Sequence, residues 1–421
     1  MGALGVFRSL RRKYGWPHAA RYLANHLLSR RHLKWPVYGR REKRNLVKVL
    51  RSGHWGGVPF PNAFAREFAE RFAALHTARY GICTTNGTTA LHAAYQAAGL
   101  GRGDEIIVPA LTFSATASAG LEQGIRPVFV DVDPGTMCID PEAARKAITP
   151  ATKAIVAVHL GAQMADLDSL LAIAEERRIL LIEDCAHAPG AKWGERGAGS
   201  IGALGCFSFQ STKLLTAGEG GLILTNDEKL AARCRSYVNF GREAAAGGSP
   251  QSLLGGNSRM TDLQAAVLLA QLDRLPDQAR RRGGNARLFT ELLGGVKGVK
   301  TLKLHPKVTA QAVYGYYFRY MNDECGGVPL TSFIRDLQDH GVPAIEKMYV
   351  PVYRAPEFGW RDAPIEVDYS VARCPVADRA AFDELVWIQH RVFLGTPRYV
   401  KWMAETIDRI LKGYRAAGIS N

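Results

Sequence analysis

One stretch near the middle of the chain joins two strand-like segments through a single lysine: Phe207-Ser208-Phe209-Gln210-Ser211-Thr212-Lys213-Leu214-Leu215-Thr216-Ala217-Gly218-Glu219-Gly220-Gly221. It starts as a short apolar run typical of a β-strand, reaches Lys213, and passes through glycines into a second apolar run at 222–224. A lysine amine loses its proton readily when it is desolvated or lies near another cation, and the neutral amine can react with a carbonyl group. Most lysines are solvated, so the surroundings have to show whether Lys213 is different.

Short apolar segments alternate with helical patterns between residues 80 and 226. Continuous apolar strands separated by helices predict a mostly parallel sheet covered on both faces, which is an α/β fold. In such sheets ligands bind beyond the carboxyl ends of the strands, where Asp184, His187 and Lys213 fall. The predicted strands are 81–84, 105–109, 127–132, 154–159, 179–183, 206–209 and 221–225, and the predicted helices are 88–98, 116–123, 141–147 and 166–177.

Two further helices are predicted before this region. The first covers residues 41–51 and ends at Gly53, because glycine readily adopts the left-handed turn that ends many helices. The second follows Asn62, a residue type that caps helices well. The residues expected to face the core are Leu46, Val47 and Leu50 on the first helix and Phe64, Phe68, Phe72 and Leu75 on the second.

The chain divides by composition into three predicted parts. Residues 1–36 form a basic N-terminal arm with a predicted helix at 19–28, residues 37–275 form a large domain, and residues 276–421 form a smaller α+β domain. The Gly- and Ala-rich segment 240–260 is predicted to be a long loop. A helix is predicted at 261–275, and Pro276 marks the expected boundary.

The composition is that of a globular protein, with 47% apolar residues and no apolar run long enough to span a membrane. The seven cysteines show no metal-ligand spacing, and we expect no secretory signal, so a cytoplasmic location is expected. The formal charge is +15, and Glu42 is the single acid among residues 1–44. Such an arm can bind nucleic acid or an anionic membrane, be solvated, or pack on a neighbouring subunit; its aromatic residues favour docking onto protein.

A phosphate site is suggested where a strand leads into a helix at Asn86-Gly87-Thr88-Thr89. Gly87 lets the backbone approach closely, and the free N–H groups of the helix start together with a Thr88 hydroxyl can hold a phosphate. Ser208, on the strand before Lys213, could add another hydroxyl. Taken alone, a Gly-Thr pair before a helix is more often a simple cap.

Two other residues follow strands and suit a ring-shaped cofactor. Asp184 ends an apolar strand, where a carboxylate can pair with a protonated ring nitrogen and make a pyridine ring an electron sink. Phe113 could stack on such a ring. Each has a simpler alternative, because an aspartate here can be a helix cap and a lone phenylalanine is more often a core residue. With the phosphate site and Lys213, however, they make up the set of groups that pyridoxal phosphate requires.

The sequence resembles the DegT/DnrJ/EryC1/StrS sugar aminotransferases, which are fold type I pyridoxal phosphate enzymes with a large domain on a mostly parallel seven-stranded sheet and a smaller C-terminal α+β domain. The resemblance runs from about residue 36 to the C-terminus. It rests on Gly103-Asp104-Glu105-Ile106-Ile107-Val108-Pro109-Ala110-Leu111-Thr112-Phe113, Pro127-Val128-Phe129-Val130-Asp131-Val132-Asp133, Ile148-Thr149-Pro150-Ala151-Thr152-Lys153-Ala154-Ile155, Glu183-Asp184-Cys185-Ala186-His187-Ala188 and Gly218-Glu219-Gly220-Gly221.

The resemblance implies a role for each candidate residue. Lys213 would be the lysine that forms an imine with the cofactor, and Asp184 would pair with its pyridine nitrogen. Gly87, Thr88 and Ser208 would bind the phosphate.

The resemblance also implies contacts on the ring and across a subunit interface. Phe113 would lie on the ring face, and His187, where many members have glutamine, would lie near the phenolic oxygen. Asn257, in Gly255-Gly256-Asn257-Ser258-Arg259-Met260, would reach the cofactor phosphate of a neighbouring subunit, so a homodimer is implied.

Within the family, Ser208-Phe209-Gln210, Val313-Tyr314-Gly315-Tyr316-Tyr317-Phe318 and Trp387-Ile388-Gln389-His390 are similar to the glutamine:scyllo-inosose aminotransferases. That branch implies transfer of an amino group from L-glutamine or L-glutamate to the ketone of a cyclitol or keto-sugar in antibiotic biosynthesis. The alternatives are an acceptor that is a nucleotide-linked or phosphorylated keto-hexose, or a non-catalytic regulator whose basic arm binds nucleic acid. Dehydratases of the family usually carry histidine in place of the lysine, so Lys213 argues against that activity.

Overall fold

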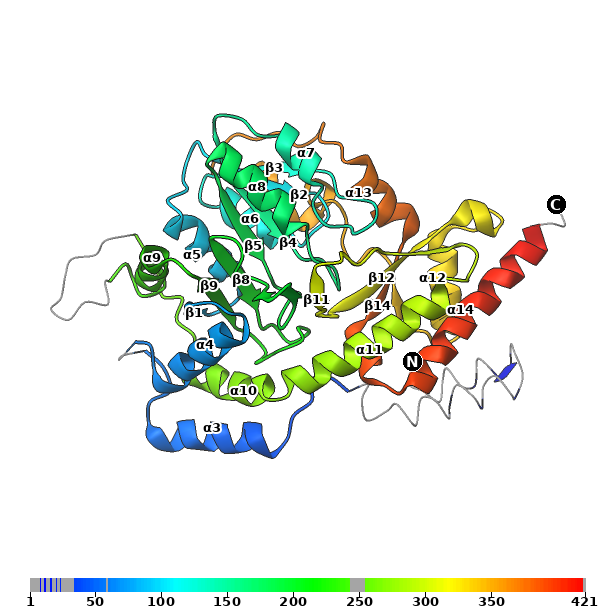
Figure 1. The fold of residues 1–421 in the computed structure, drawn as a ribbon, viewed down its shortest axis with the longest axis horizontal. Coiled ribbons are helices and arrows are strands. Elements are labelled where there is room, and N and C mark those ends of the chain that lie inside the picture. The colour runs from blue at the N-terminus through cyan, green and yellow to red at the C-terminus, as the bar shows by residue number, and fades with distance from the viewer. Residues whose placement is uncertain are drawn as a thin grey trace.

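A computed structural model describes residues 34–57, 60–242 and 254–418, together with Arg8, Arg11, Arg12, Trp16, Ala20 and Leu23 of the N-terminal arm. Most of the helix predicted at 19–28 and the middle of the loop predicted at 240–260 lie outside these residues. Figure 1 shows a large sheet with its helices at one end of the molecule and a smaller sheet with α12 and α14 at the other, joined along one side by α11.

The large sheet has seven strands in the order β1-β9-β8-β5-β4-β2-β3. Strands β8, β5, β4, β2 and β3 pair in parallel, whereas β9 runs antiparallel to both of its neighbours. The predicted α/β fold with a mostly parallel seven-stranded sheet is therefore confirmed. In spatial order the strands are β1 (Tyr80–Thr84), β9 (Gly221–Thr225), β8 (Leu204–Ser208), β5 (Leu180–Asp184), β4 (Thr152–Val158), β2 (Glu105–Pro109) and β3 (Arg126–Val130).

Helices connect these strands and cover the sheet. The pattern of buried residues explains the packing of α8, because Leu167, Leu170 and Ile173 recur at helical spacing and lie against β4 and β5. The helix α5 contacts β8 and β9 instead. The connecting helices are α5 (Gly87–Ala97), α6 (Ala115–Leu121), α7 (Pro141–Lys146), α8 (Leu167–Arg177) and α9 (Glu228–Val238).

The two helices before the sheet differ from each other. In α4 (Ala63–Leu75) Phe68 and Phe72 are fully buried, as predicted. Asn62 stands at the N-cap position, but its side chain makes no capping hydrogen bond. The carboxylate of Asp262 accepts the free backbone N–H of Ala65 instead, at 2.9 Å, so the cap comes from a distant part of the chain.

The prediction for the first helix, α3 (Arg40–Ser52), was partly wrong. It ends at Gly53 in the left-handed conformation, as expected. However, Val47 and Leu50 are exposed, whereas Glu42 is buried. Arg274 compensates the Glu42 carboxylate at 3.0 Å, which a sequence pattern of apolar residues does not reveal.

The predicted helix at 261–275 is interrupted in the structure. The helix α10 (Asp262–Leu272) ends before Arg274, and a new helix, α11 (Leu275–Leu293), starts with Pro276 in its first turn. Proline favours the first turn of a helix because its missing N–H has no partner there. The rule that proline ends a helix therefore placed the break slightly too late.

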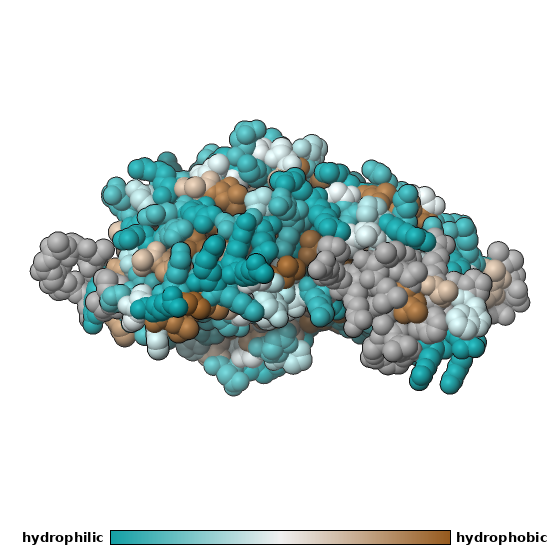
Figure 2. Space-filling model, turned by 90° about the horizontal axis from the view of Figure 1, so that it is seen from below, coloured by the Kyte–Doolittle hydropathy of each residue, from teal (hydrophilic) through white to brown (hydrophobic). Residues whose placement is uncertain are grey.

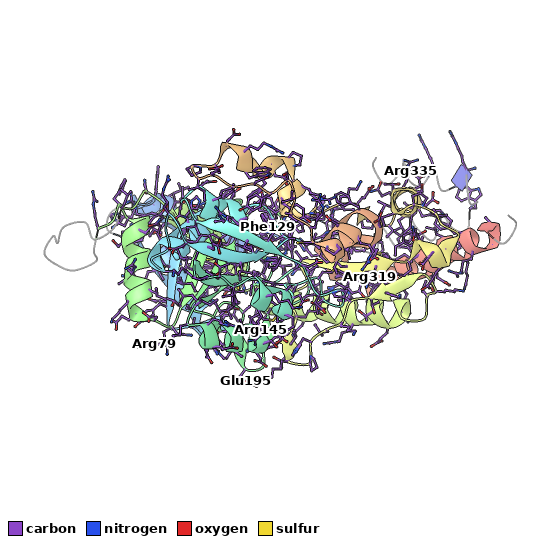
Figure 3. The ribbon with its side chains drawn as sticks, turned by 90° about the horizontal axis from the view of Figure 1, so that it is seen from above. Arg79, Phe129, Arg145, Glu195, Arg319 and Arg335 are labelled. Atoms are coloured by element: carbon purple, nitrogen blue, oxygen red, sulfur yellow. The ribbon has the colours of Figure 1, made fainter. Side chains whose placement is uncertain are left out.

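The C-terminal part builds its own core around a four-stranded antiparallel sheet in the order β10-β12-β14-β13. Arg319 of β12, labelled in Figure 3, forms an ion pair with the carboxylate of the buried Glu384 at 2.7 Å. The elements are β10 (Val299–Thr301), β12 (Gly315–Tyr320), β13 (Ala344–Ile345), β14 (Leu385–Gln389), α12 (Leu330–Asp339), α13 (Pro375–Arg379) and α14 (Pro397–Gly418).

Short elements complete the fold. A three-stranded sheet consists of β11 (Val308–Ala310), β6 (Lys192–Trp193) and β7 (Arg196–Gly197). The 3₁₀ helices are η1 (Asn322–Cys325), η2 (Val352–Arg354), η3 (Pro356–Phe358), η4 (Trp360–Asp362) and η6 (His390–Leu394), and η5 (Ala380–Glu384) is a π-helical turn.

The C-terminal part also packs back onto the large sheet. The ring of Phe129 in β3, labelled in Figure 3, lies 5.7 Å from that of Tyr353, 5.5 Å from that of Phe358 and 4.9 Å from that of Tyr369. Figure 2 shows that the face seen from below is mostly hydrophilic, with small separate hydrophobic patches. Among the described residues, no helix combines the length and the apolar character needed to cross a membrane.

Candidate active site

A cavity of about 720 Å³ lies at the carboxyl ends of β5 and β8. This is the edge at which parallel sheets bind their ligands. The cavity brings together seven of the eight residues singled out in the sequence, whose roles stay predictions: Gly87, Thr88, Phe113, Asp184, His187, Ser208 and Lys213.

One end of the cavity is the start of α5. The side chain of Asn86 accepts the backbone N–H of Thr89 at 2.9 Å and caps the helix. The N–H groups of Gly87 and Thr88 have no intrahelical acceptor and can bind an anion. A Cβ atom at position 87 would lie 2.7 Å from Cβ of Ser208, so only glycine lets the helix start approach the end of β8. Gly87, Thr88 and Ser208 therefore form a polar cradle that could hold a phosphate.

Asp184 lies at the end of β5 and is buried. The hydroxyl of Thr116 donates to its Oδ2 at 2.8 Å, and the backbone N–H of Ala186 donates to its Oδ1 at 3.1 Å. Within the described part of the chain no lysine or arginine lies at ion-pair distance from this carboxylate. A buried carboxylate without a cationic partner is costly, so its surroundings suit a ligand that brings a positive N–H.

Lys213 lies on the turn that follows β8, with Nζ 4.6 Å from the centre of the Tyr314 ring. Its pKa is lowered to about 8, because desolvation disfavours the ammonium form while the nearby Asp184 carboxylate opposes the shift. At pH 7 roughly a tenth of the amine is then neutral, whereas an ordinary lysine is almost fully protonated.

His187 is held in one protonation state. The backbone N–H of Gly161 donates to Nδ1 at 3.2 Å, so this nitrogen carries no proton, and Nε2–H donates to the hydroxyl of Tyr349 at 3.1 Å. Burial, together with the nearby positive charge of Lys213, lowers the pKa of His187 well below its ordinary value. The ring also stacks on that of Tyr314, with a distance of 4.1 Å between their centres.

The two remaining candidate residues, Phe113 and Asn257, differ in their position relative to the cavity. Phe113 lines the cavity, and 54% of its surface is exposed, which leaves a ring face free to stack on a ligand. Asn257 is not among the residues that line the cavity of its own chain. It is exposed, and its backbone forms an isolated antiparallel β-bridge with Asn239. Its predicted contact with a neighbouring subunit stays a prediction.

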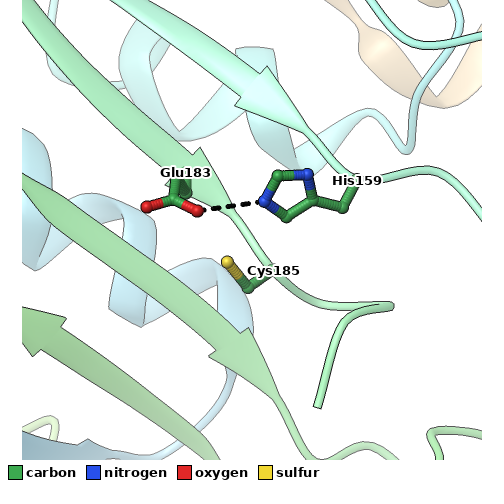
Figure 4. Close-up of side chains that lie close together, drawn as sticks. All are labelled: His159, Glu183 and Cys185. Carbon is green, nitrogen blue, oxygen red and sulfur yellow. Dashed lines mark hydrogen bonds and ion pairs between the residues drawn. The ribbon is translucent and has the colours of Figure 1, made fainter. Parts of the chain in front are cut away.

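A buried cluster next to the cavity consists of His159, which also lines the cavity, Glu183 and Cys185, and their potential ligand atoms lie within 4.8 Å of one another (Figure 4). Nδ1 of His159 accepts the backbone N–H of Ala165, and Nε2–H donates to Glu183 at 3.1 Å. The carboxylate of Glu183 also accepts three backbone N–H groups from residues 199–202. These hydrogen bonds engage the histidine and the carboxylate, so the cluster stabilises the loop after β7.

Sequence patterns missed several residues of the cavity. Tyr349 and Lys347 come from a segment without regular periodicity, and they reach the cavity only because the C-terminal part folds over it. Thr116 does not line the cavity but contacts Asp184, and it was not singled out because it looks like an ordinary helix residue. The lining residues for which no role in the site was predicted include Thr112, His159, Gln210, Thr212, Glu219, Tyr314, Lys347, Met348, Tyr349 and Glu357.

The sequence matches the DegT/DnrJ/EryC1/StrS aminotransferase family over residues 37–401. The chain belongs to this family. This aminotransferase therefore has fold type I, and its cofactor is pyridoxal phosphate.

Individual relatives agree with this assignment. The aminotransferase is 37% identical, over 90% of its length and 93% of the relative's, to a putative L-glutamine:3-amino-2,3-dideoxy-scyllo-inosose aminotransferase of Micromonospora echinospora. It is 36% identical to 3-amino-5-hydroxybenzoate synthase of Amycolatopsis mediterranei, over 89% of its length and 95% of the relative's. A crystal structure of 3-amino-5-hydroxybenzoic acid synthase superposes with a TM-score of 0.81 at 33% identity, covering 90% of this chain and 98% of the other.

Proposed function

We propose that this aminotransferase moves an amino group from L-glutamine or L-glutamate to the ketone of a cyclitol or keto-sugar in antibiotic biosynthesis. The observation that carries the proposal is the meeting of Lys213, Asp184 and the Gly87–Ser208 cradle in one cavity. The names of the relatives supply the substrate class, since they act on inososes with glutamine as the donor.

The residues of the cavity fit pyridoxal phosphate. Lys213 would bind its aldehyde carbon, Asp184 its pyridine nitrogen, and Gly87, Thr88 and Ser208 its phosphate. Phe113 would cover the ring, and His187 would lie near the phenolic oxygen. When bound, the cofactor supplies an electron sink for the negative charge that remains when the donor loses its α-proton.

The protein's own groups would handle the protons. With a pKa of about 8, Nζ of Lys213 can take the α-proton of the amino donor as a base and give a proton back as an acid near neutral pH. Thr116 and the N–H of Ala186 orient the Asp184 carboxylate so that it keeps a ring nitrogen protonated. His187 stays neutral and fixes the hydroxyl of Tyr349 as an acceptor of its N–H, which frees the hydroxyl proton of Tyr349 for the ligand.

The charges of the cavity wall favour an uncharged acceptor. Among its described lining residues, Lys213 and Lys347 are the only lysines or arginines, and Glu219 and Glu357 add negative charge. A nucleotide-linked sugar carries a diphosphate, which usually requires arginines or several cations. The surroundings thus suit a polyhydroxylated ring such as an inosose.

We also propose that the working enzyme is a homodimer in the cytoplasm. The exposed side chains of Val47, Leu50 and Trp55 lie on and after α3, where a second copy would cover them. In such a dimer Asn257 would contact the partner's cofactor phosphate. The seven cysteines are free thiols, which suits a reducing compartment.

The test is to incubate the purified protein and its cofactor with L-glutamine and a panel of ketones, and to measure amine formation. We expect turnover with inososes and little with nucleotide-linked keto-sugars. The reverse preference would replace the proposed acceptor by the nucleotide-linked alternative.

Lys213→Ala is expected to lower transamination by about 10³-fold or more, because the variant lacks both the covalent attachment and the proton carrier. The measurement is single-turnover conversion of glutamine, with circular dichroism as a control for folding. Unchanged turnover in a folded variant would rule out the role proposed for Lys213.

A further inference from the structure

Trp35 lies just before the residues that match the family, in the segment predicted to be a separate arm. Its indole N–H donates to the backbone carbonyl of Ser211 at 3.0 Å. Ser211 precedes Lys213 by two positions on the turn after β8. The end of the arm therefore contacts the backbone that carries the candidate catalytic lysine.

Groups of the C-terminal part hold the next residue of the same turn. Nε2–H of His390 donates to the carbonyl of Thr212 at 3.0 Å, and the Thr212 hydroxyl bonds to that of Tyr314 at 2.9 Å. The rings of Trp35 and His390 meet edge to face at 4.8 Å. Two successive carbonyl groups before Lys213 are thus held by side chains from opposite ends of the chain.

A buried cation lies against the indole ring. The guanidinium of Arg282 in α11 lies 5.0 Å from the centre of the Trp35 ring, and its Nε and Nη1 atoms have no hydrogen-bond partner among the residues that the structure describes. Burial lowers the pKa of Arg282 to about 9. A desolvated cation gains from an aromatic face, so Arg282 favours the observed position of the indole.

We propose that Trp35 is a positioning residue that fixes the Ser211–Thr212 turn and thereby holds the amine of Lys213 over the Tyr314 ring. The turn has hydrogen bonds of its own, from the N–H of Lys213 to the carbonyl of Gln210 at 2.9 Å and from the N–H of Thr212 to the Gln210 side chain at 2.8 Å. The contacts of Trp35 and His390 join this turn to the rest of the molecule. The inference rests on the role proposed for Lys213, and it gives the end of the arm a function in the active site.

The expected consequence is a change in the lysine itself. The titratable groups around Lys213 are Asp184 on β5, His187 after it, Tyr314 before β12 and His390 at the start of η6. Of these, Asp184 favours the ammonium, and desolvation opposes it. If the turn loosens and Nζ moves from its partly buried position over Tyr314 into the open cavity, the pKa of Lys213 should rise toward its ordinary value.

The experiment compares Trp35→Phe with wild type in the full-length protein without cofactor. Trp35→Phe keeps an aromatic ring near His390 and Arg282 but removes the five-membered ring with its N–H, whereas Trp35→Ala removes the aromatic ring as well. The pH dependence of acetylation at Lys213 is measured by peptide mass spectrometry with limiting acetic anhydride. If the pKa of Lys213 rises from about 8 to about 9, the fraction of neutral, reactive amine at pH 8 falls about fivefold. We expect at least this loss of labelling for Trp35→Ala and a smaller loss for Trp35→Phe.

Trp193→Phe is the matched control, because it also removes one indole hydrogen bond of 3.0 Å, to Asp168, away from the cavity. It should lower the melting temperature without changing the labelling of Lys213. Equal labelling profiles for wild type, Trp35→Phe and Trp193→Phe would overturn the proposal, even if all variants lose stability. A separate experiment treats the wild type and pyridoxal phosphate with borohydride, which would attach the cofactor to Lys213. Failure to label Lys213 in this way would count against the proposed function, while the comparison of the Trp35 variants would remain valid.

Discussion

Two neighbouring acids of β5, Glu183 and Asp184, face different regions of the molecule. Glu183 is fully buried, and its carboxylate accepts hydrogen bonds from His159 and three backbone N–H groups. Asp184 lines the open cavity, held by Thr116 and one backbone N–H. Because successive strand residues point to opposite sides, one position along the chain separates a structural carboxylate from one available to a ligand.

The largest expected difference is in activity. Asp184→Asn should lower transamination by about 10²–10³-fold, because the amide cannot stabilise a protonated ring nitrogen, while the melting temperature changes little. The measurement is single-turnover conversion of glutamine together with thermal unfolding. If the variant were fully active, Asp184 would belong with Glu183 as a structural residue.

Glu183→Gln is expected to lower the stability of the protein more than its activity. This isosteric change places an amide NH₂ group against backbone N–H donors and should lower the free energy of unfolding by about 3 kcal/mol. Urea unfolding would measure the loss, and activity per folded molecule should fall far less than in Asp184→Asn. A stable, inactive Glu183→Gln would reverse the assignment of the two acids.

The buried carboxylate of Glu183 should also make the stability of the protein depend on pH. Burial raises the pKa of Glu183, but the hydrogen bonds from His159 and the backbone outweigh this, so the pKa lies below the ordinary value of 4.5. A carboxylate with a lowered pKa contributes stability above its unfolded value that is lost as the pH falls through its folded value. Wild-type stability should therefore decline below about pH 4.5 more steeply than that of Glu183→Gln, as measured by urea unfolding at several pH values.

The smallest effect is expected for Thr116→Val, which removes the hydroxyl that donates to Asp184 at 2.8 Å. Loss of one such hydrogen bond is worth about 1 kcal/mol, so the rate of transamination should fall about fivefold. Thr112→Val is a suitable control, because its hydroxyl bonds to that of Thr116 and not to the carboxylate. Equal effects of the two substitutions would show that the Thr116 contact has no special importance.

Local patterns predicted the central sheet well because each buried parallel strand is a continuous apolar run and each connecting helix has its own periodicity. They failed where a distant residue supplied a compensating interaction. The Asn62 cap is replaced by Asp262, and Glu42 is buried only because Arg274 pairs with it. For the site, the prediction identified residues at strand ends, since the geometry of a parallel sheet brings such positions together.

The rest of the cavity lay beyond prediction for a physical reason. Tyr349 and Lys347 belong to an irregular segment of the C-terminal part, and Thr116 looks like any helix residue until its hydroxyl is seen against Asp184. A hydrogen bond across many positions leaves no periodic trace in the sequence.

The sequence by itself determined the sheet, the family and the positions of Lys213 and Asp184, because these follow from the order of short local segments. Only the tertiary structure decided the protonation state of His187, the lowered pKa of Lys213 and the contact of Trp35 with the turn before that lysine. Those properties arise from desolvation and from hydrogen bonds between distant parts of the chain, and they exist only once the chain is folded.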